Sequence, residues 1–108
     1  MPTGLADFNG LLYSAIEDTI VEVLGRKVFL ALREGLETRF GVTSEELAYR
    51  TDTMYNMLEG TFGVVGAKTL GTHIAMKFYA KLGLHFERHD SYTLVDYVEA
   101  AKAALSRA

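Results

Sequence analysis

The chain has 108 residues, of which 49% are hydrophobic and 23% are charged, and its formal net charge is -3. This length accommodates one domain around one core, residues 1–108, and leaves no room for a second. The acidic balance argues against nucleic acid as a partner, and the absence of cysteine excludes disulfides and thiolate chemistry.

The N-terminal part of the chain shows neither a secretory signal nor a membrane span. Residues 1–12 have no basic start and already carry Asp7. The most apolar stretch, residues 11–24, is short and is interrupted by acidic side chains between Glu17 and Glu22. We therefore expect a cytoplasmic protein without a membrane partner.

Apolar residues recur at three- and four-residue steps through the first forty positions, which is the spacing of amphipathic helices. The pattern predicts a helix over about 6–24 that ends in a left-handed cap at Gly25. One long helix through Gly25 fits the same pattern. The apolar stripe then continues to Gly41, which is the next predicted cap.

A clear local signal marks the start of the next helix. Thr43 and Glu46 form the Ser/Thr-x-x-Glu capping box, and Val42 can pack on Leu47 as a hydrophobic staple. These residues predict a third helix that continues to about residue 62. Good capping residues from Thr51 onward allow the alternative of a short helix followed by a longer one.

A fourth helix is predicted over about 64–82, and small residues form a ridge along it. A ridge of this kind lets another backbone approach closely, at a cost of about 1 kcal/mol of helix propensity for each glycine. The ridge could pack within the chain, against helix one or three, or against a second copy of the chain, and the first use is the simpler. Its members are Gly63, Ala67, Gly71 and Ala75.

Gly83 is predicted to end this helix. Residues 84–92 show alternating side-chain types and are predicted to form either a loop or a short extended strand. Thr93 and Asp96 repeat the capping box and predict a last helix that ends near Ser106. The expected fold is therefore all-α, a single compact bundle of about five helices with a short extended segment at 84–92 as an option. The expected core comprises Leu12, Ile16, Ile20, Leu32, Leu36, Leu47, Leu58, Phe62, Leu70, Ile74, Phe78, Val98 and Leu105.

Two candidate sites follow from these elements. A small molecule could lie between helices against Gly66, Ala67 and Gly71, with His73 and Tyr79 as polar contacts. Helical bundles commonly place their binding sites in this way.

The second candidate is a metal site. His85 and His89 would share one side of a helix or a strand, and imidazole is a common ligand of zinc and other divalent ions. Their spacing is not an established metal signature, and a solvated loop with two ordinary histidines is the simpler interpretation. The sequence predicts no cofactor and no enzyme, because no nucleophile and base occur in a recognisable arrangement.

Several short motifs resemble those of one protein family, over most of the chain from Gly25 onward. The chain resembles a small helical domain of archaeal proteins that is sometimes attached to signal-transduction modules as an output domain. The resemblance implies an archaeal, cytoplasmic origin and a role in signalling or regulation, and it implies no catalytic residues. The motifs are Gly25-Arg-Lys-Val28, Leu36-Glu-Thr-Arg-Phe-Gly-Val42, Leu58-Glu-Gly-Thr-Phe-Gly63, Gly66-Ala-Lys68, Tyr79-Ala-Lys-Leu-Gly-Leu84 and Tyr92-Thr-Leu-Val-Asp-Tyr-Val98.

Two functional hypotheses remain. The first is a noncatalytic regulatory or protein-interaction domain that binds a protein partner or a second copy of itself as a homodimer, through surface that the monomer leaves apolar. The alternative is a small-molecule or metal sensor that binds its ligand between helices.

Overall fold

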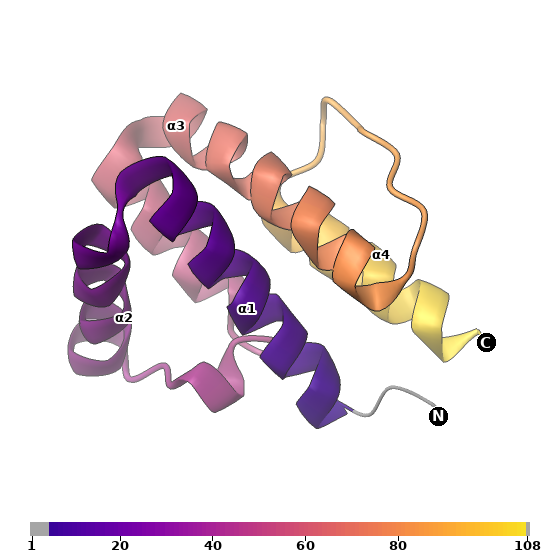
Figure 1. Ribbon diagram of the computed structural model, residues 1–108, viewed down its shortest axis with the longest axis horizontal. Coiled ribbons are helices and arrows are strands. Elements are labelled where there is room, and N and C mark those ends of the chain that lie inside the picture. Colours follow the sequence, from indigo (N-terminus) through magenta and orange to yellow (C-terminus); the bar gives the residue numbers. More distant parts are fainter. Residues whose placement is uncertain (1–4, 108) are drawn as a thin grey trace.

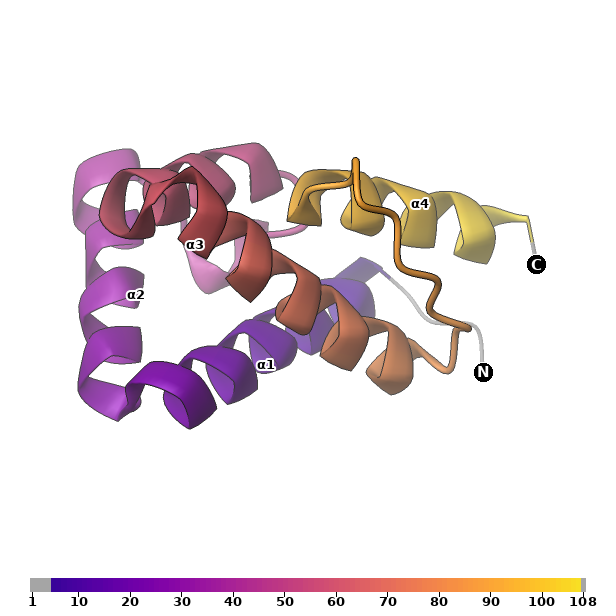
Figure 2. The same cartoon turned by 90° about the horizontal axis from the view of Figure 1, so that it is seen from above.

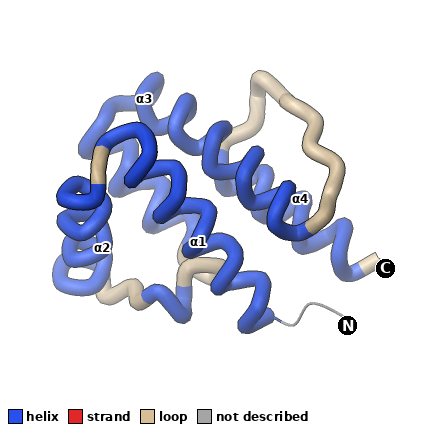
Figure 3. Tube along the Cα trace, in the orientation of Figure 1, coloured by secondary structure: helices blue, strands red, loops and turns tan. Residues whose placement is uncertain are grey.

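The computed structural model describes residues 5–107, and each regular element in that range is helical (Figure 1, Figure 3). The all-α prediction is confirmed. No helix in this range is long and apolar enough to cross a membrane. The elements are α1 (Leu5–Leu24), α2 (Arg26–Phe40), a 3-10 turn η1 (Ser44–Glu46), α3 (Thr51–Leu82) and α4 (Leu94–Ser106).

The described range therefore holds four α-helices rather than about five, because the predicted third and fourth helices follow each other through a kink at Gly63 and form one element, α3. At Gly63 the backbone is not helical, with φ 81° and ψ 170°, a region open almost only to glycine. Figure 2 shows the two halves of α3 turning sharply at this point. The capping box at Thr43 is present, but it heads only η1, and α3 begins at Thr51, as the alternative interpretation proposed.

Gly25 separates α1 from α2, so one long helix through this position is ruled out. Its φ of 94° and ψ of 161° are not those of the predicted left-handed cap, since ψ is extended. The chain consequently turns a corner, and Figure 2 shows α2 directed sharply away from α1. Gly41 and Gly83 do adopt the left-handed cap conformation, with φ of 64° and 73°.

The core lies where α3 meets α1 on one side and α4 on the other. Phe78 of α3 packs edge-on against Phe8 of α1, with ring centroids 4.9 Å apart. The next residue, Tyr79, packs edge-on against Tyr97 of α4 at 6.3 Å. The predicted core is buried except for three residues that are half-buried against it, Leu32, Phe62 and Leu105.

Residues 84–92 form an irregular loop, and no strand occurs in the range 5–107. Leu84 and Phe86 face the core, while His85 and Glu87 are exposed. Burial therefore alternates along the segment as the sequence pattern indicates, although the segment pairs with no strand within residues 5–107. The loop runs back along α3 and leads into α4 (Figure 1). At its end, the backbone N–H of Thr93 donates to Asp96 Oδ2 at 2.9 Å, which completes the second predicted capping box.

Candidate interaction groove

Three of the four residues of the small ridge on α3 pack inside the chain, whereas Gly63 at its start is exposed. Ala67, Gly71 and Ala75 are buried. A Cβ atom built on Gly71 would lie 3.2 Å from Leu94 Cβ and 3.3 Å from Tyr55 Cε1. The start of α4 and the first half of α3 therefore fill the space against Gly71 where we expected a ligand.

Tyr79, the predicted polar contact, also belongs to the packing between α3 and α4. Its hydroxyl donates to the backbone carbonyl of Tyr97 at 2.6 Å, and its ring meets Phe86 edge-on at 5.4 Å. Burial raises the pKa of Tyr79, and the neighbouring Tyr92 and Tyr97 raise it further. The hydroxyl is thus held neutral and engaged within the protein.

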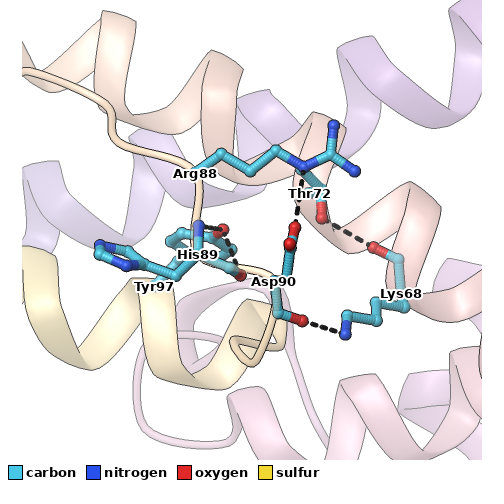
Figure 4. A network of polar contacts seen from close by, with 6 residues as sticks. All are labelled: Lys68, Thr72, Arg88, His89, Asp90 and Tyr97. Atoms are coloured by element: carbon cyan, nitrogen blue, oxygen red, sulfur yellow. Dashed lines mark hydrogen bonds and ion pairs between the residues drawn. The ribbon is translucent and has the colours of Figure 1, made fainter.

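The loop of residues 84–92 is attached to α4 through Tyr97. The Tyr97 hydroxyl accepts a hydrogen bond from the backbone N–H of His89 at 2.8 Å and donates to the His89 carbonyl at 3.1 Å (Figure 4). The His89 ring also stacks on Tyr92, with centroids 4.4 Å apart. These contacts fix the middle of a loop that has no regular secondary structure.

An open groove of about 360 Å³ lies between the second half of α3 and this loop. Three large apolar side chains along it face solvent: Val64, Val65 and Met76 are 68%, 80% and 48% exposed. Polar side chains from both elements complete the wall. The groove is lined by Val64, Val65, Lys68, Thr69, Thr72, His73, Met76, Arg88, His89 and Asp90.

The charges in the groove are arranged around Asp90. The Lys68 ammonium donates to the backbone carbonyl of Asp90, and Arg88 Nε lies 3.7 Å from Asp90 Oδ1 (Figure 4). The Thr72 hydroxyl donates to the carbonyl of Lys68 at 3.0 Å. Two cations and one carboxylate give the lining a formal charge of +1, opposite in sign to the -3 of the whole chain.

The structure separates the predicted histidines. His73 and His89 both line the groove, whereas His85 is exposed outside its lining. His73 Nδ1 lies 3.0 Å from the carbonyl of Thr69 on its own helix. Within residues 5–107, no three side chains of the His, Cys, Asp and Glu types gather into a group that could hold a metal ion. The proposed pair of His85 and His89 thus has no third protein ligand in this range.

A second cavity lies among α1, α2, the residues that flank η1 and the first half of α3, and its wall is mostly apolar. Its volume is about 30 Å³, which is about the size of one water molecule, so it is a packing gap rather than a ligand site.

Sequence reasoning found only His73 and His89 among the residues that line the groove. Among the other lining residues, Lys68 appeared only within a motif of the family resemblance, and Arg88 was not singled out. A usable signal was present, because Val65, Thr69, Thr72 and Met76 recur at steps of four, three and four residues and form a second stripe on the same helix.

Comparison of the chain with protein-family models, with curated proteins and with solved structures gave no match.

Proposed function

We propose that this chain is a noncatalytic regulatory domain that binds a protein partner in the groove between α3 and the loop of residues 84–92. One observation carries the proposal: Val64, Val65 and Met76 stay exposed along this groove. Solvent-facing apolar side chains that cluster beside polar ones are typical of interaction surfaces.

The polar contacts support binding rather than catalysis. The Thr72 hydroxyl donates to a backbone carbonyl, and the Lys68 ammonium donates to the carbonyl of Asp90. Neither contact activates a nucleophile. The resemblance to output domains of archaeal signal-transduction proteins supports a regulatory role in that setting.

The proposal is tested by selecting binders from a display library of random peptides about 16 residues long, about four helical turns. We expect peptides that bind the wild-type domain and lose about tenfold or more in affinity for a Val65→Ser, Met76→Ser double variant. We call these groove-dependent peptides. The control is Phe40→Ser, which removes an exposed apolar side chain from the C-terminal end of α2 and should leave their affinity unchanged. A selection that yields no groove-dependent peptide refutes the proposal.

We further propose that the domain self-associates as a homodimer. Its support is a second set of exposed apolar residues near the Gly25 corner, Val23, Leu24 and Leu30. Sedimentation velocity over a wide concentration range should show a dimer that Leu30→Glu weakens and Val65→Glu leaves intact. A monomer at every concentration would refute self-association, and the reverse pattern of variants would mean that the groove holds a second copy.

A further inference from the structure

The geometry points to one class of occupant: we propose that the groove binds an acidic amphipathic helix, with apolar side chains on one face and carboxylates beside them. This inference rests on the proposed function and specifies the partner for the same groove. Its basis is charge complementarity, because a lining of formal charge +1 occurs on a chain of net charge -3.

The shape of the α3 wall suits a helical partner. Val65 and Met76 are eleven residues apart on one helix, which places them about 16 Å apart along its axis, or about three turns. Between them the groove is lined by the small Thr69 and Thr72 and by the longer Lys68 and His73. Apolar anchors at both ends allow a second helix to insert apolar side chains there and to place polar side chains over the middle.

The cations remain available to a partner. The Arg88 and Asp90 side chains are 74% and 98% exposed, and an ion pair this exposed contributes little to stability. A carboxylate from a partner can therefore replace or join Asp90 at the Arg88 guanidinium at low cost. Lys68 directs one of its three ammonium N–H groups to the Asp90 carbonyl, which leaves two for an incoming carboxylate.

The two cationic groups come together at the loop wall of the groove, around Asp90. Lys68 projects from α3, and Arg88 projects from the loop. A helix lying in the groove would thus meet both positive charges along the edge that faces the loop. An acidic helix satisfies both charges, whereas a basic one would be repelled by both.

The test measures the charge of the groove-dependent peptides and their dependence on these two cations. We expect the sequences to carry more Asp and Glu than Lys and Arg. Their affinity should fall about tenfold or more for a Lys68→Glu, Arg88→Glu double variant and should weaken with rising ionic strength. Amide cross-peaks of residues 64–76 and 88–90 should shift when a peptide is added.

The matched control is Lys27→Glu with Arg107→Glu, two exposed cations outside the groove lining, so that both double variants have the same net charge. Circular dichroism confirms that both fold. Groove-dependent peptides that are neutral or basic would overturn the acidic partner and leave the proposed function standing. Acidic peptides whose affinity falls equally for the control variant would also overturn the acidic partner, because their binding would then reflect net charge alone. The absence of any groove-dependent peptide refutes the proposed function instead.

Discussion

The Tyr97 hydroxyl bonds to both backbone polar groups of His89, eight residues earlier in the chain. A phenylalanine at position 97 would keep the ring and leave the His89 N–H without this acceptor. We expect Tyr97→Phe to lower the free energy of unfolding by about 1–3 kcal/mol. The amide of His89 should exchange faster with solvent, and the affinity of groove-dependent peptides should fall. Hydrogen exchange followed by NMR measures the first effect directly.

Tyr49→Phe is the control for this variant, because Tyr49 is exposed on the surface. It should change neither the exchange rate at His89 nor peptide affinity. Equal exchange rates at His89 in wild type and Tyr97→Phe would show that the loop is held by other contacts.

Gly71→Leu should destabilise the fold by at least about 1–3 kcal/mol, because its side chain would collide with Leu94 and Tyr55. Gly60→Leu on the same helix is the matched comparison. Nothing lies within 4 Å of a Cβ atom at Gly60, so that variant should be neutral or slightly stabilising. Urea unfolding of the two variants measures the difference, and equal midpoints would refute close packing at Gly71.

Gly63→Ala should also destabilise the fold, by about 1–3 kcal/mol, and for a different reason. Nothing lies within 4 Å of a Cβ atom there, so the cost comes from the backbone conformation at φ 81° and not from a collision. Gly60→Ala should instead stabilise α3 by up to about 1 kcal/mol. If both alanine variants raised the melting temperature, α3 would not be bent at Gly63.

Stability should fall at alkaline pH. Burial raises the pKa of both Tyr55 and Tyr79 above the ordinary value, so the folded state keeps its protons at a pH where the unfolded state has released them. The free energy of unfolding is then level below about pH 10 and declines as the pH rises further. Urea unfolding from pH 8 to 11 measures the slope, and Tyr55→Phe with Tyr79→Phe should flatten it. A slope unchanged in the double variant would assign the decline to other groups.

Features determined by neighbouring residues could be predicted from the sequence. The capping boxes of Thr43 and Thr93 each depend on a side chain three positions away, and both are present. The left-handed caps at Gly41 and Gly83 depend on the freedom of a single residue. Of the thirteen core residues predicted from helical periodicity, ten are buried.

Contacts between distant parts of the chain could not be predicted in the same way. The backbone N–H of Ala48 donates to Asn9 Oδ1 at 2.6 Å, and its carbonyl accepts from Lys102 Nζ at 2.5 Å. Neither Asn9 nor Lys102 belongs to a sequence motif that predicts the contact. The groove was missed for the same reason, because Lys68 and Asp90 meet only once the loop has folded back along α3.

The attachment of the loop through backbone atoms has a consequence for how this protein could diversify. Tyr97 recognises the peptide groups of position 89, which every residue except proline supplies, and makes no demand on the side chains at positions 87, 88 or 90. Exposed side chains there can therefore be exchanged while the helical scaffold stays as it is. Related proteins could share one architecture and acquire different partners through a few substitutions in a single loop.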